Sequence, residues 1–261
     1  MKFTGERLVP KDKTCGSETE IYKEHIARYQ FAKKFINNNN VILDIACGTG
    51  YGTHMLCENI SCLAYGCDIS KEAINYAKQN YSTLNIKFEV MDATKLLFPE
   101  NFFDCIICFE TIEHLENPEK SIMEFVRVLK DNGIIIISTP NKNISLKNKS
   151  ENEFHEHEFT RDEFLKILSK YFTSTELYSQ KLIIKPTLKE KILKFILSST
   201  FKVTKYDKVN LRHKLLKKGI GNHLYKSVNV SYREPTVIPY DDTHLPQNFI
   251  AVSLKNKNHK G

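Results

Sequence analysis

From residue 41 onward, short apolar runs alternate with stretches that have the periodicity of helices, and this alternation limits the fold more than any other feature. Helical patterns lie at 53–59, 71–79, 118–130 and 160–169. The runs of strand length and composition lie at 41–46, 63–68, 86–91, 103–109, 134–138, 174–179 and 249–254. Strands separated by helices of this length predict an α/β fold, with a mostly parallel sheet that is covered by helices on both faces.

Two segments depart from this alternation. A helical pattern at 18–36 precedes the first strand, and about seventy residues separate the last two strand-like runs, far more than an ordinary connection. We therefore expect a single domain with four parts: an N-terminal helical cap at 1–40, a core at 41–185, a basic insert at 186–245, and a final strand and tail at 246–261.

Positive charge is concentrated in and just before the basic insert. Residues 181–218 contain twelve lysines and arginines against two acidic residues, a local balance of +10 in a chain whose net charge is +7. Apolar side chains recur there at helical spacing beside lysines, at Leu188, Ile192, Phe195 and Ile196. Three interpretations stay open: a lid packed on the acceptor side of the domain, a contact in a homodimer, or a helix resting on an anionic membrane surface.

Cysteine usage and hydropathy indicate the compartment. No apolar run approaches the roughly 20 residues of a membrane-spanning helix, and no apolar segment follows the charges of the first residues, so we expect no secretory signal. The seven cysteines are an odd number scattered through strand-like stretches, which favours reduced thiols over a disulfide framework. We therefore expect a cytoplasmic protein.

A glycine-rich turn, D-I-A-C-G-T-G-Y-G at 44–52, lies at the end of the first strand. Glycine has no Cβ and tolerates positive φ, so such a turn lets a ligand approach the backbone closely. Its spacing differs from the G-x-G-x-x-G of dinucleotide sites, and the acid Asp44 would repel a pyrophosphate but suits a ligand with an ammonium and a sulfonium. Asp68 ends the second strand, where a carboxylate accepts hydrogen bonds from ribose hydroxyls. Asp92, after the third strand, is placed to accept from an adenine amino group.

These segments resemble the class I S-adenosylmethionine-dependent methyltransferases, in a match that spans about 41–140. The matching pieces are the glycine-rich turn, C-D-I-S at 67–70, M-D-A at 91–93 and F-D-C-I-I-C-F-E-T-I-E-H-L at 103–115. The resemblance implies a Rossmann-like sheet of seven strands with the last strand antiparallel, a helical insert before that strand, and S-adenosylmethionine as cofactor. The cofactor-binding residues that it implies are Asp44, Ala46, Cys47, Gly48, Gly50, Tyr51, Asp68, Ile69, Asp92, Ala93 and Phe109.

The segment Glu110-Thr-Ile-Glu113-His114 follows the fourth strand, at the mouth of the expected cleft. As one helical turn it would place Glu110, Glu113 and His114 on one face, which would make a divalent-metal half-site. E-x-x-E-H also occurs in two methyltransferase branches that use a divalent ion, one in ubiquinone synthesis and one that 2′-O-methylates the 3′ ends of small RNAs. The RNA branch adds a histidine just before a segment like F-x-T-R-x-E-F, and His157 is the closest counterpart here.

Three roles stay open for these side chains. The first is a Mg²⁺ or Mn²⁺ site formed by Glu110, Glu113, His114 and His157. The second is a general base that needs no metal, either His114 or His157, because an alcohol acceptor must lose its proton. The third is polar support of the cleft wall.

Motifs outside the core narrow the resemblance. F-T-G-E-R-L-V-P at 3–10, E-H-I-A-R-Y at 24–29 and S-T-P-N at 138–141 are similar to a bacterial methyltransferase subfamily associated with polysaccharide and glycoconjugate assembly. The subfamily implies that the N-terminal segment folds over the cofactor, with Arg28 or Arg7 pairing with the methionine carboxylate, since a guanidinium matches a carboxylate bidentately. The alternative is that Arg28 is an exposed helix residue.

The expected reaction is O-methylation of a small acceptor, a sugar or a nucleotide-linked or phosphorylated precursor of a surface polysaccharide. A phosphorylated acceptor would suit the basic insert. Two alternatives remain. RNA 2′-O-methylation fits the E-x-x-E-H pattern, but the lysines lack the interleaved aromatics of a single-strand binding surface. A non-catalytic partner of another methyltransferase would have little need for the whole cofactor pocket.

Overall fold

The computed structural model describes residues 20–148, 152, 154–184, 233–240 and 246–255 of the 261-residue chain. The chain divides into two units, the first comprising Met1–Lys181 and Pro235–Gly261, the second Leu182–Glu234. Nearly all described residues belong to the first unit, so the role predicted for the basic insert stays a prediction. Within the ranges described, no helix has the length and apolar character that crossing a bilayer requires.

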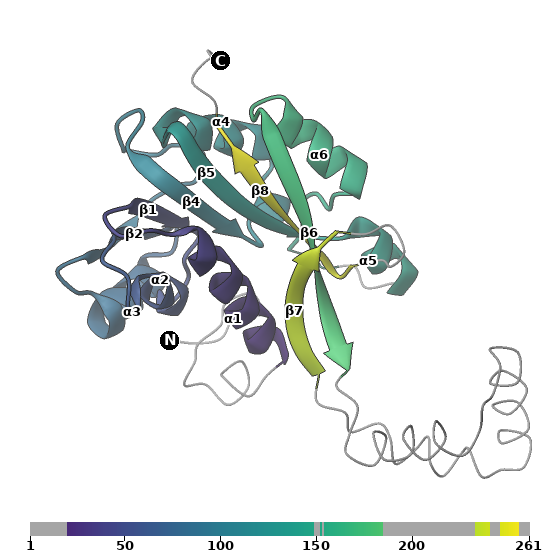
Figure 1. The fold of residues 1–261 in the computed structure, drawn as a ribbon, viewed down its shortest axis with the longest axis horizontal. Helices are drawn as coiled ribbons and strands as arrows, with labels where there is room; N and C mark the ends of the chain where they lie inside the picture. Colours follow the sequence, from purple (N-terminus) through teal and green to yellow (C-terminus); the bar gives the residue numbers. More distant parts are fainter. Residues whose placement is uncertain (1–19, 149–151, 153, 185–232, 241–245, 256–261) are drawn as a thin grey trace, which may run out of the picture. The chain divides into compact units, whose positions relative to one another are not determined.

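A sheet of eight strands forms the framework, in the order β3-β2-β1-β4-β5-β8-β6-β7 (Figure 1). Neighbouring strands from β3 to β5 are parallel, whereas β8 is antiparallel to both β5 and β6. The strands are β1 (Val41–Ile45), β2 (Leu63–Asp68), β3 (Ile86–Val90), β4 (Phe103–Phe109), β5 (Leu129–Pro140), β6 (Ser174–Ile184), β7 (Arg233–Pro239) and β8 (Asn248–Leu254). The seven predicted strands and the antiparallel last strand are confirmed.

The strand that the sequence does not predict is β7, which comes from the end of the basic insert and lies at the edge of the sheet. Its sequence, R-E-P-T-V-I-P, contains two prolines, which normally argue against a strand. Proline lacks an N–H group and is therefore confined to edge strands, where one side of the ladder needs no partner. The edge position of β7 explains why a proline-containing segment extends the sheet.

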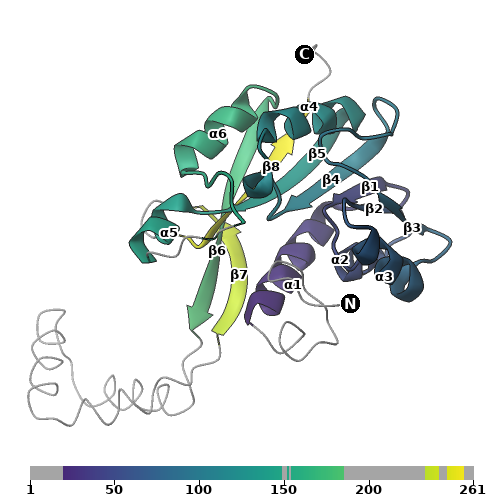
Figure 2. The same cartoon turned by 180° about the vertical axis from the view of Figure 1, so that it is seen from behind.

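Helices cover both faces of the sheet (Figures 1 and 2). They are α1 (Glu20–Ala32), α2 (Tyr51–Cys57), α3 (Lys71–Tyr81), α4 (Pro118–Val128), α5 (Lys142–Asn148) and α6 (Arg161–Ser169), with short 3₁₀ turns η1 (Lys33–Phe35) and η2 (Ile112–His114). Side chains of α1, α2 and α3, such as Leu56, pack in one core, and those of α4 and α6, such as Phe125, pack in another. In β1, Ile42 belongs to the first core and Leu43 to the second, because successive strand residues point to opposite faces.

The helices begin where the sequence supplies capping side chains. Ser70, Asn117 and Thr160 accept hydrogen bonds from backbone N–H groups in the first turns of α3, α4 and α6. The capping box predicted at Thr160 is confirmed, since Glu163 also accepts from the Thr160 N–H group. The helix predicted at 118–130 ends two residues earlier, because β5 begins at Leu129.

Strand register brings distant segments to one edge of the sheet. The carboxyl ends of β1 to β5 share this edge because the five strands are parallel. The antiparallel β8 begins at the same edge, where Asn248 is opposite Pro140 of β5 and Gln180 of β6. Ligands of open α/β sheets bind outside the carboxyl ends of the strands, so this edge is the place to look for a site.

Candidate functional site

The turn after β1 passes through three residues with positive φ: Ala46 at 56°, Gly48 at 55° and Gly50 at 82°. A Cβ on Gly50 would lie 2.7 Å from the Cβ of Ala77. Gly52 is required for a different reason, because the ring of Tyr29 would lie 2.0 Å from a Cβ at that position. The glycines therefore let the turn fit between α1 and α3 at the carboxyl edge of the sheet.

Asp44 is buried beneath this turn and contacts two hydroxyl groups. Thr53 Oγ1 donates to Oδ2 at 2.6 Å, and Tyr29 Oη lies 3.2 and 3.3 Å from the two carboxylate oxygens. Burial raises the pKa of Asp44 to about 7, although both hydrogen bonds lower it, and the charge of Asp68 raises it further. A cation in the cleft would favour the ionised form of Asp44.

Asp68 joins the second strand to the glycine-rich turn. Its Oδ2 accepts a hydrogen bond from Gly48 N at 2.9 Å, and its Oδ1 accepts from Ser70 N at 2.8 Å. The next residue, Ile69, is 73% exposed, an apolar side chain open to the ring of a ligand. A carboxylate, a glycine backbone and an apolar surface thus lie together at the ends of β1 and β2.

Three further predicted residues lie near the same edge. Asp92 is exposed and its Oδ1 accepts from Thr94 N at 2.7 Å, whereas Ala93 beside it is buried. Cys47 is buried, and its N–H group donates to the carbonyl of Cys67 at 3.0 Å. This backbone hydrogen bond fixes the glycine-rich turn to the end of β2.

Tyr51 and Phe109, the remaining predicted cofactor residues of the core, are buried against the ring of Tyr29. Their ring centroids lie 5.9 and 5.2 Å from the Tyr29 centroid, both in edge-on geometry. Burial raises the pKa of Tyr29 well above its usual value, so its hydroxyl stays protonated and donates to Asp44. Helix α1 therefore closes one side of the site with an aromatic cluster.

Arg28 of α1 is 2% exposed, so the alternative of an exposed helix residue is wrong. Its Nη1 donates to Oε1 of Gln180 and lies 4.0 Å from Oε2 of Glu110. Within the described residues, Arg28 Nε has no hydrogen-bond partner. Pairing of this guanidinium with a methionine carboxylate stays a prediction, and the other candidate, Arg7, lies outside the described residues.

Glu110 follows β4 with a left-handed backbone, at φ 48°, which is a strained conformation for a residue other than glycine. Ser138 Oγ donates to its Oε1 at 2.6 Å, and Asn248 Nδ2 donates to its Oε2 at 2.5 Å. The chain then forms only the 3₁₀ turn η2. The expectation that Glu110 shares one helical face with Glu113 and His114 is therefore wrong, because the left-handed residue prevents a helical turn from starting there.

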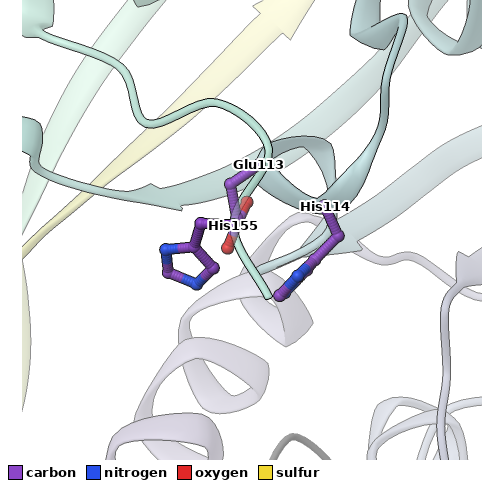
Figure 3. A group of neighbouring side chains, drawn as sticks. All are labelled: Glu113, His114 and His155. Carbon is purple, nitrogen blue, oxygen red and sulfur yellow. The ribbon is translucent and has the colours of Figure 1, made fainter. Parts of the chain in front are cut away.

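Glu113, His114 and His155 form a group whose ligand-type atoms all lie within 4.8 Å of one another (Figure 3). Glu113 is fully buried, and Thr139 Oγ1 donates to its Oε2 at 3.1 Å. Its Oε1 has no hydrogen-bond partner among the residues that the structure describes. Burial, and then the charge of Glu110, raise the pKa of Glu113 well above its usual range.

In both histidines of this group, the ring nitrogen Nδ1 has a partner that fixes the orientation of the ring. His114 Nδ1 lies 2.8 Å from the carbonyl oxygen of Phe154, and His155 Nδ1 lies 2.8 Å from Oε1 of Glu158. His155 Nε2 lies 2.9 Å from Nδ2 of Asn152, an amide donor, so Nε2 accepts and Nδ1 carries the proton. Histidines that bind a metal through one ring nitrogen commonly donate the N–H of the other nitrogen to a carboxylate, as His155 does to Glu158.

His157 has a different environment from the one predicted. Its side chain is exposed, and its ring packs against Phe159 with centroids 4.5 Å apart. Only its backbone reaches the group described above, through an N–H group that donates to the Glu113 carbonyl at 3.0 Å. The observed group therefore contains His155 in place of His157, and it does not include Glu110.

Sequence reasoning missed several polar residues at this edge. Tyr29 lies in the E-H-I-A-R-Y segment, next to the predicted Arg28, and Thr139 lies in the S-T-P-N motif. Both motifs were available signals. Gln180 and Asn248 had no local signal, because only the antiparallel register of β6 and β8 places them opposite each other.

The fold and this edge define a Rossmann-like α/β protein with a candidate ligand site at the carboxyl ends of β1, β2 and β4. The family model described as "Methyltransferase domain" matches residues 36–191, more than half of the chain. The chain therefore belongs to the methyltransferase domain family.

Individual relatives agree with this family. A Mycobacterium tuberculosis protein named "Probable S-adenosylmethionine-dependent methyltransferase" is 29% identical over 175 residues, which cover 64% of this chain and 60% of that protein. The chain thus spans less than two thirds of this relative. Phosphoethanolamine N-methyltransferase 3 of Arabidopsis thaliana is 33% identical over 99 residues, which cover 37% of this chain and 20% of that protein.

A solved structure shows the same fold over most of the chain. A SAM-dependent methyltransferase from Archaeoglobus fulgidus aligns with a TM-score of 0.57 and 18% identity, covering 92% of this chain and 95% of that one. At this identity the likeness concerns the fold alone.

S-adenosylmethionine is the cofactor of this family, and the residues present fit it. The buried Nε of Arg28 has an N–H donor without a partner among the described residues, which suits a carboxylate, and Asp68 supplies a carboxylate for ribose hydroxyls. The exposed Ile69 supplies an apolar surface for a base, and Asp44 can balance a positive charge.

Proposed function

We propose that this protein uses S-adenosylmethionine to methylate an oxygen atom of a small polar acceptor, a sugar or a nucleotide-linked or phosphorylated precursor of a surface polysaccharide. One observation carries the methyltransferase part of the proposal. The Asp68 carboxylate accepts from Gly48 N and Ser70 N beside the exposed Ile69, so a ribose acceptor, a glycine backbone and an apolar surface converge at the ends of β1 and β2.

Each part of the cofactor has a counterpart in this chain. Bound S-adenosylmethionine supplies a methyl group that its sulfonium already activates. Asp68 would bind the ribose hydroxyls, and the backbone at Gly48 and Gly50 would hold the methionine portion. Ile69 would provide an apolar surface for the adenine ring, and Asp92 would accept from its amino group.

Arg28 and Asp44 act on the charged end of the cofactor. The guanidinium of Arg28 would pair with the methionine carboxylate through its unpartnered Nε donor. Asp44, buried and held by Thr53 and Tyr29, stabilises the positive charges of the ligand from beneath the turn. Positioning of the methyl carbon against the acceptor is then the largest contribution of the protein to the rate.

An alcohol acceptor must lose its proton as the new carbon–oxygen bond forms. Glu113 and His114, in the turn after β4, and His155, between α5 and α6, are the described residues best suited to this task. As a base, His155 would act through Nε2, and the acceptor hydroxyl would displace the Asn152 amide that donates to this nitrogen. Glu158 would stabilise the protonated ring through Nδ1. His114 is the second candidate for this role.

A divalent ion is the alternative role for the same three residues, and the donor set fits one. Glu113 would provide a carboxylate oxygen, and His114 and His155 would provide one nitrogen each. The buried, unpartnered Oε1 of Glu113 and the Glu158 carboxylate behind His155 are features of a ligand site. Two imidazoles favour Mn²⁺ over Mg²⁺, which prefers oxygen ligands. Such an ion would lower the pKa of an acceptor hydroxyl.

The acceptor class rests on sequence features outside the site. The motifs at 3–10 and 24–29 support a glycan precursor, and the basic residues of 181–218 support a phosphorylated one, although most of them lie outside the described residues. The Arabidopsis relative is named for phosphoethanolamine, a small phosphorylated amine. That name supports a phosphorylated acceptor and makes nitrogen the competing methylated atom.

An acceptor screen tests the proposal. The full chain is incubated with methyl-labelled S-adenosylmethionine and separately with nucleotide sugars, sugar phosphates, phosphoethanolamine and a short RNA, and products are read by mass spectrometry for one added methyl group. Methylation of a sugar oxygen would support the proposal in full. Preference for phosphoethanolamine or for RNA would overturn the acceptor class and keep the methyltransferase. Cofactor binding without any turnover would favour a non-catalytic partner of another enzyme.

A further inference from the structure

A pair of thiols lies at the end of β2 opposite to the candidate cofactor site. Cys57 is the last residue of α2, and Cys62 precedes the first residue of β2, whose far end carries Asp68. The two Sγ atoms lie 2.9 Å apart, and the side chains are 8% and 4% exposed. Neither residue has a part in the proposed methyl transfer.

The two sulfurs are chemically unequal. The hydrogen bond with Cys57 lowers the pKa of Cys62, and the positive charge of Lys33 lowers it further. The same hydrogen bond, together with burial, raises the pKa of Cys57. In the neutral pair Cys62 donates to Cys57. The directions of the two pKa shifts make Cys62 the thiol that ionises first, after which Cys57 keeps its proton. The thiolate is the reactive form of cysteine.

The other described cysteines lack this combination. Burial raises the pKa of Cys47, Cys67, Cys105 and Cys108, which keeps these thiols protonated and unreactive. Cys105 and Cys108 have C-x-x-C spacing, but they belong to the cores on opposite faces of the sheet. Alternation along β4 therefore prevents the pair with the more familiar spacing from bonding.

We propose that Cys57 and Cys62 are a site of reversible oxidation that forms a disulfide when the protein meets hydrogen peroxide. The Cys62 thiolate attacks one peroxide oxygen, the oxygen–oxygen bond breaks, and Cys62 becomes a sulfenic acid with release of hydroxide. The sulfur of Cys57 then attacks the sulfur of Cys62, and the sulfenic oxygen takes the Cys57 proton and leaves as water. The proton that Cys62 lost on ionising neutralises the hydroxide released in the first step. The two thiols lose two electrons in total, and the peroxide is reduced to two waters.

The bond would close the connection at 58–61 between α2 and β2. It restricts the unfolded chain, so the oxidised protein should unfold at a higher temperature than the reduced one. A small thiol such as glutathione reverses the reaction by thiol–disulfide exchange. Cys57 thus serves as a resolving thiol within the same chain. By forming the disulfide, it protects Cys62 from further oxidation.

The sequence allows a direct test, because Glu58 lies between the two cysteines. The full-length protein is treated with hydrogen peroxide, its remaining thiols are blocked with N-ethylmaleimide, and the chain is cut after glutamate. Cleavage at Glu58 separates Cys57 from Cys62 unless a disulfide joins them. The expected product is a linked pair of peptides, lighter by two hydrogen atoms than the separate peptides and split by dithiothreitol.

Variants identify the roles of the two thiols. Cys57→Ser removes the resolving thiol, so dimedone should capture a sulfenic acid on Cys62, and Cys62→Ser should abolish both products. Cys105→Ala, which removes a buried thiol with a raised pKa, is the matched control and should leave the linked peptides unchanged. The central measurement uses the wild-type chain and does not depend on any variant folding. Blocking of both thiols after peroxide treatment, or a bond from Cys62 to Cys47 or Cys67, would overturn the proposal.

Discussion

The carboxyl edge of the sheet has a cofactor side, at the ends of β1 and β2, and an acceptor side, which begins at the end of β4. The contacts that hold these two sides differ greatly in sequence separation. Asp44 and Asp68, on the cofactor side, bond to partners at most twenty positions away, of which Gly48 is the most distant from its acid. On the acceptor side, Glu110 bonds to Asn248, which is 138 positions away. Arg28, a cofactor-side residue of α1, is the exception, because its bond to Gln180 spans 152 positions.

This difference separates what can be read locally from what cannot. A strand followed by a glycine-rich turn and a helix places its own polar groups, so the cofactor side follows from one short segment. The acceptor side depends on longer-range contacts. The register of β8 places Asn248 beside Glu110, and hydrogen bonds from the N–H groups of Glu156 and His157 to the Glu113 carbonyl bring His155 beside Glu113. Related methyltransferases with the same cofactor side can therefore differ in their acceptors, because function resides in the site and not in the fold.

The most severe test of the cofactor side is Asp68→Ala. Two charge-assisted hydrogen bonds to ribose are worth about 1.5–3 kcal/mol each, so the Kd for S-adenosylmethionine should rise by about 10²–10⁴-fold. Calorimetry measures the Kd, and thermal unfolding checks that the turn survives loss of the bonds to Gly48 N and Ser70 N. Glu89→Ala, which removes an exposed acid of β3, is the control. Unchanged affinity in Asp68→Ala would overturn the assignment of this side as the cofactor site.

On the acceptor side, the sharpest comparison is His155→Ala against His157→Ala. Loss of a general base costs about 10²–10⁴-fold in turnover, and we expect this loss for His155 and a similar one for His114. The exposed His157 should matter much less, because its ring contacts Phe159 and only its backbone reaches Glu113. Cofactor affinity should stay constant in all three variants. The opposite order of the two histidines would reinstate the prediction made from the linear motif.

A chelator distinguishes the two roles of this group. Activity lost with a chelator and restored by Mn²⁺ better than by Mg²⁺ would favour the metal, because two of the three donors are imidazoles. Glu113→Gln should then abolish the response to the ion. Activity that resists the chelator but still requires His155 would favour the base.

The pH dependence of cofactor binding tests how Asp44 contributes. Its folded pKa of about 7 is above the ordinary value, so below pH 7 a cationic ligand must displace a proton from this carboxyl group. Affinity should therefore rise with pH up to about 7, by at most about tenfold per pH unit, and then level off. Calorimetry between pH 5.5 and 8.5 (about the usable range around this pKa) measures the effect, and Asp44→Asn should remove it.

The same group sets a matching expectation for the unliganded protein. Between about pH 4 and pH 7 the unfolded chain has already released the proton that folded Asp44 retains. The contribution of Asp44 to the free energy of unfolding should therefore fall as pH rises through this window. Denaturant titrations at each pH should show a decline in the wild type that is reduced in Asp44→Asn. An equal decline in both proteins would contradict the expectation.

The smallest effect concerns the basic insert, at Lys202, Lys205 and Lys208, which lie outside the described residues. As part of a lid, their joint replacement by glutamine should raise the KM for a phosphorylated acceptor by a few fold and leave cofactor affinity unchanged. Salt should act similarly, since exposed charges are screened over about 8 Å at physiological ionic strength. Binding to anionic vesicles that is lost in high salt would favour the membrane interpretation. A change of oligomeric state in Leu188→Glu would favour the homodimer.

Several elements show what could be predicted from the sequence. The seven strands follow from the spacing of apolar residues, and the capping box at Thr160 follows from local side-chain chemistry. Both signals act within a few residues. The edge strand β7 was missed because its prolines oppose a strand everywhere except at an edge, and the sequence does not state which strand is last. Burial of Arg28 was also undetermined, since its partners are 82 and 152 positions away.

The sequence by itself determined the α/β class, the glycine-rich turn and the acids at the ends of β1 and β2, because each is a short-range consequence of residue type and spacing. Only the tertiary structure decided that His155 joins Glu113 and His114, that Glu110 turns instead toward Asn248, and that Arg28 is buried. The reason is geometric. A left-handed residue at 110 and the antiparallel register of β8 turn Glu110 toward Asn248. Backbone hydrogen bonds from Glu156 and His157 to Glu113, more than forty positions away, bring His155 into its group.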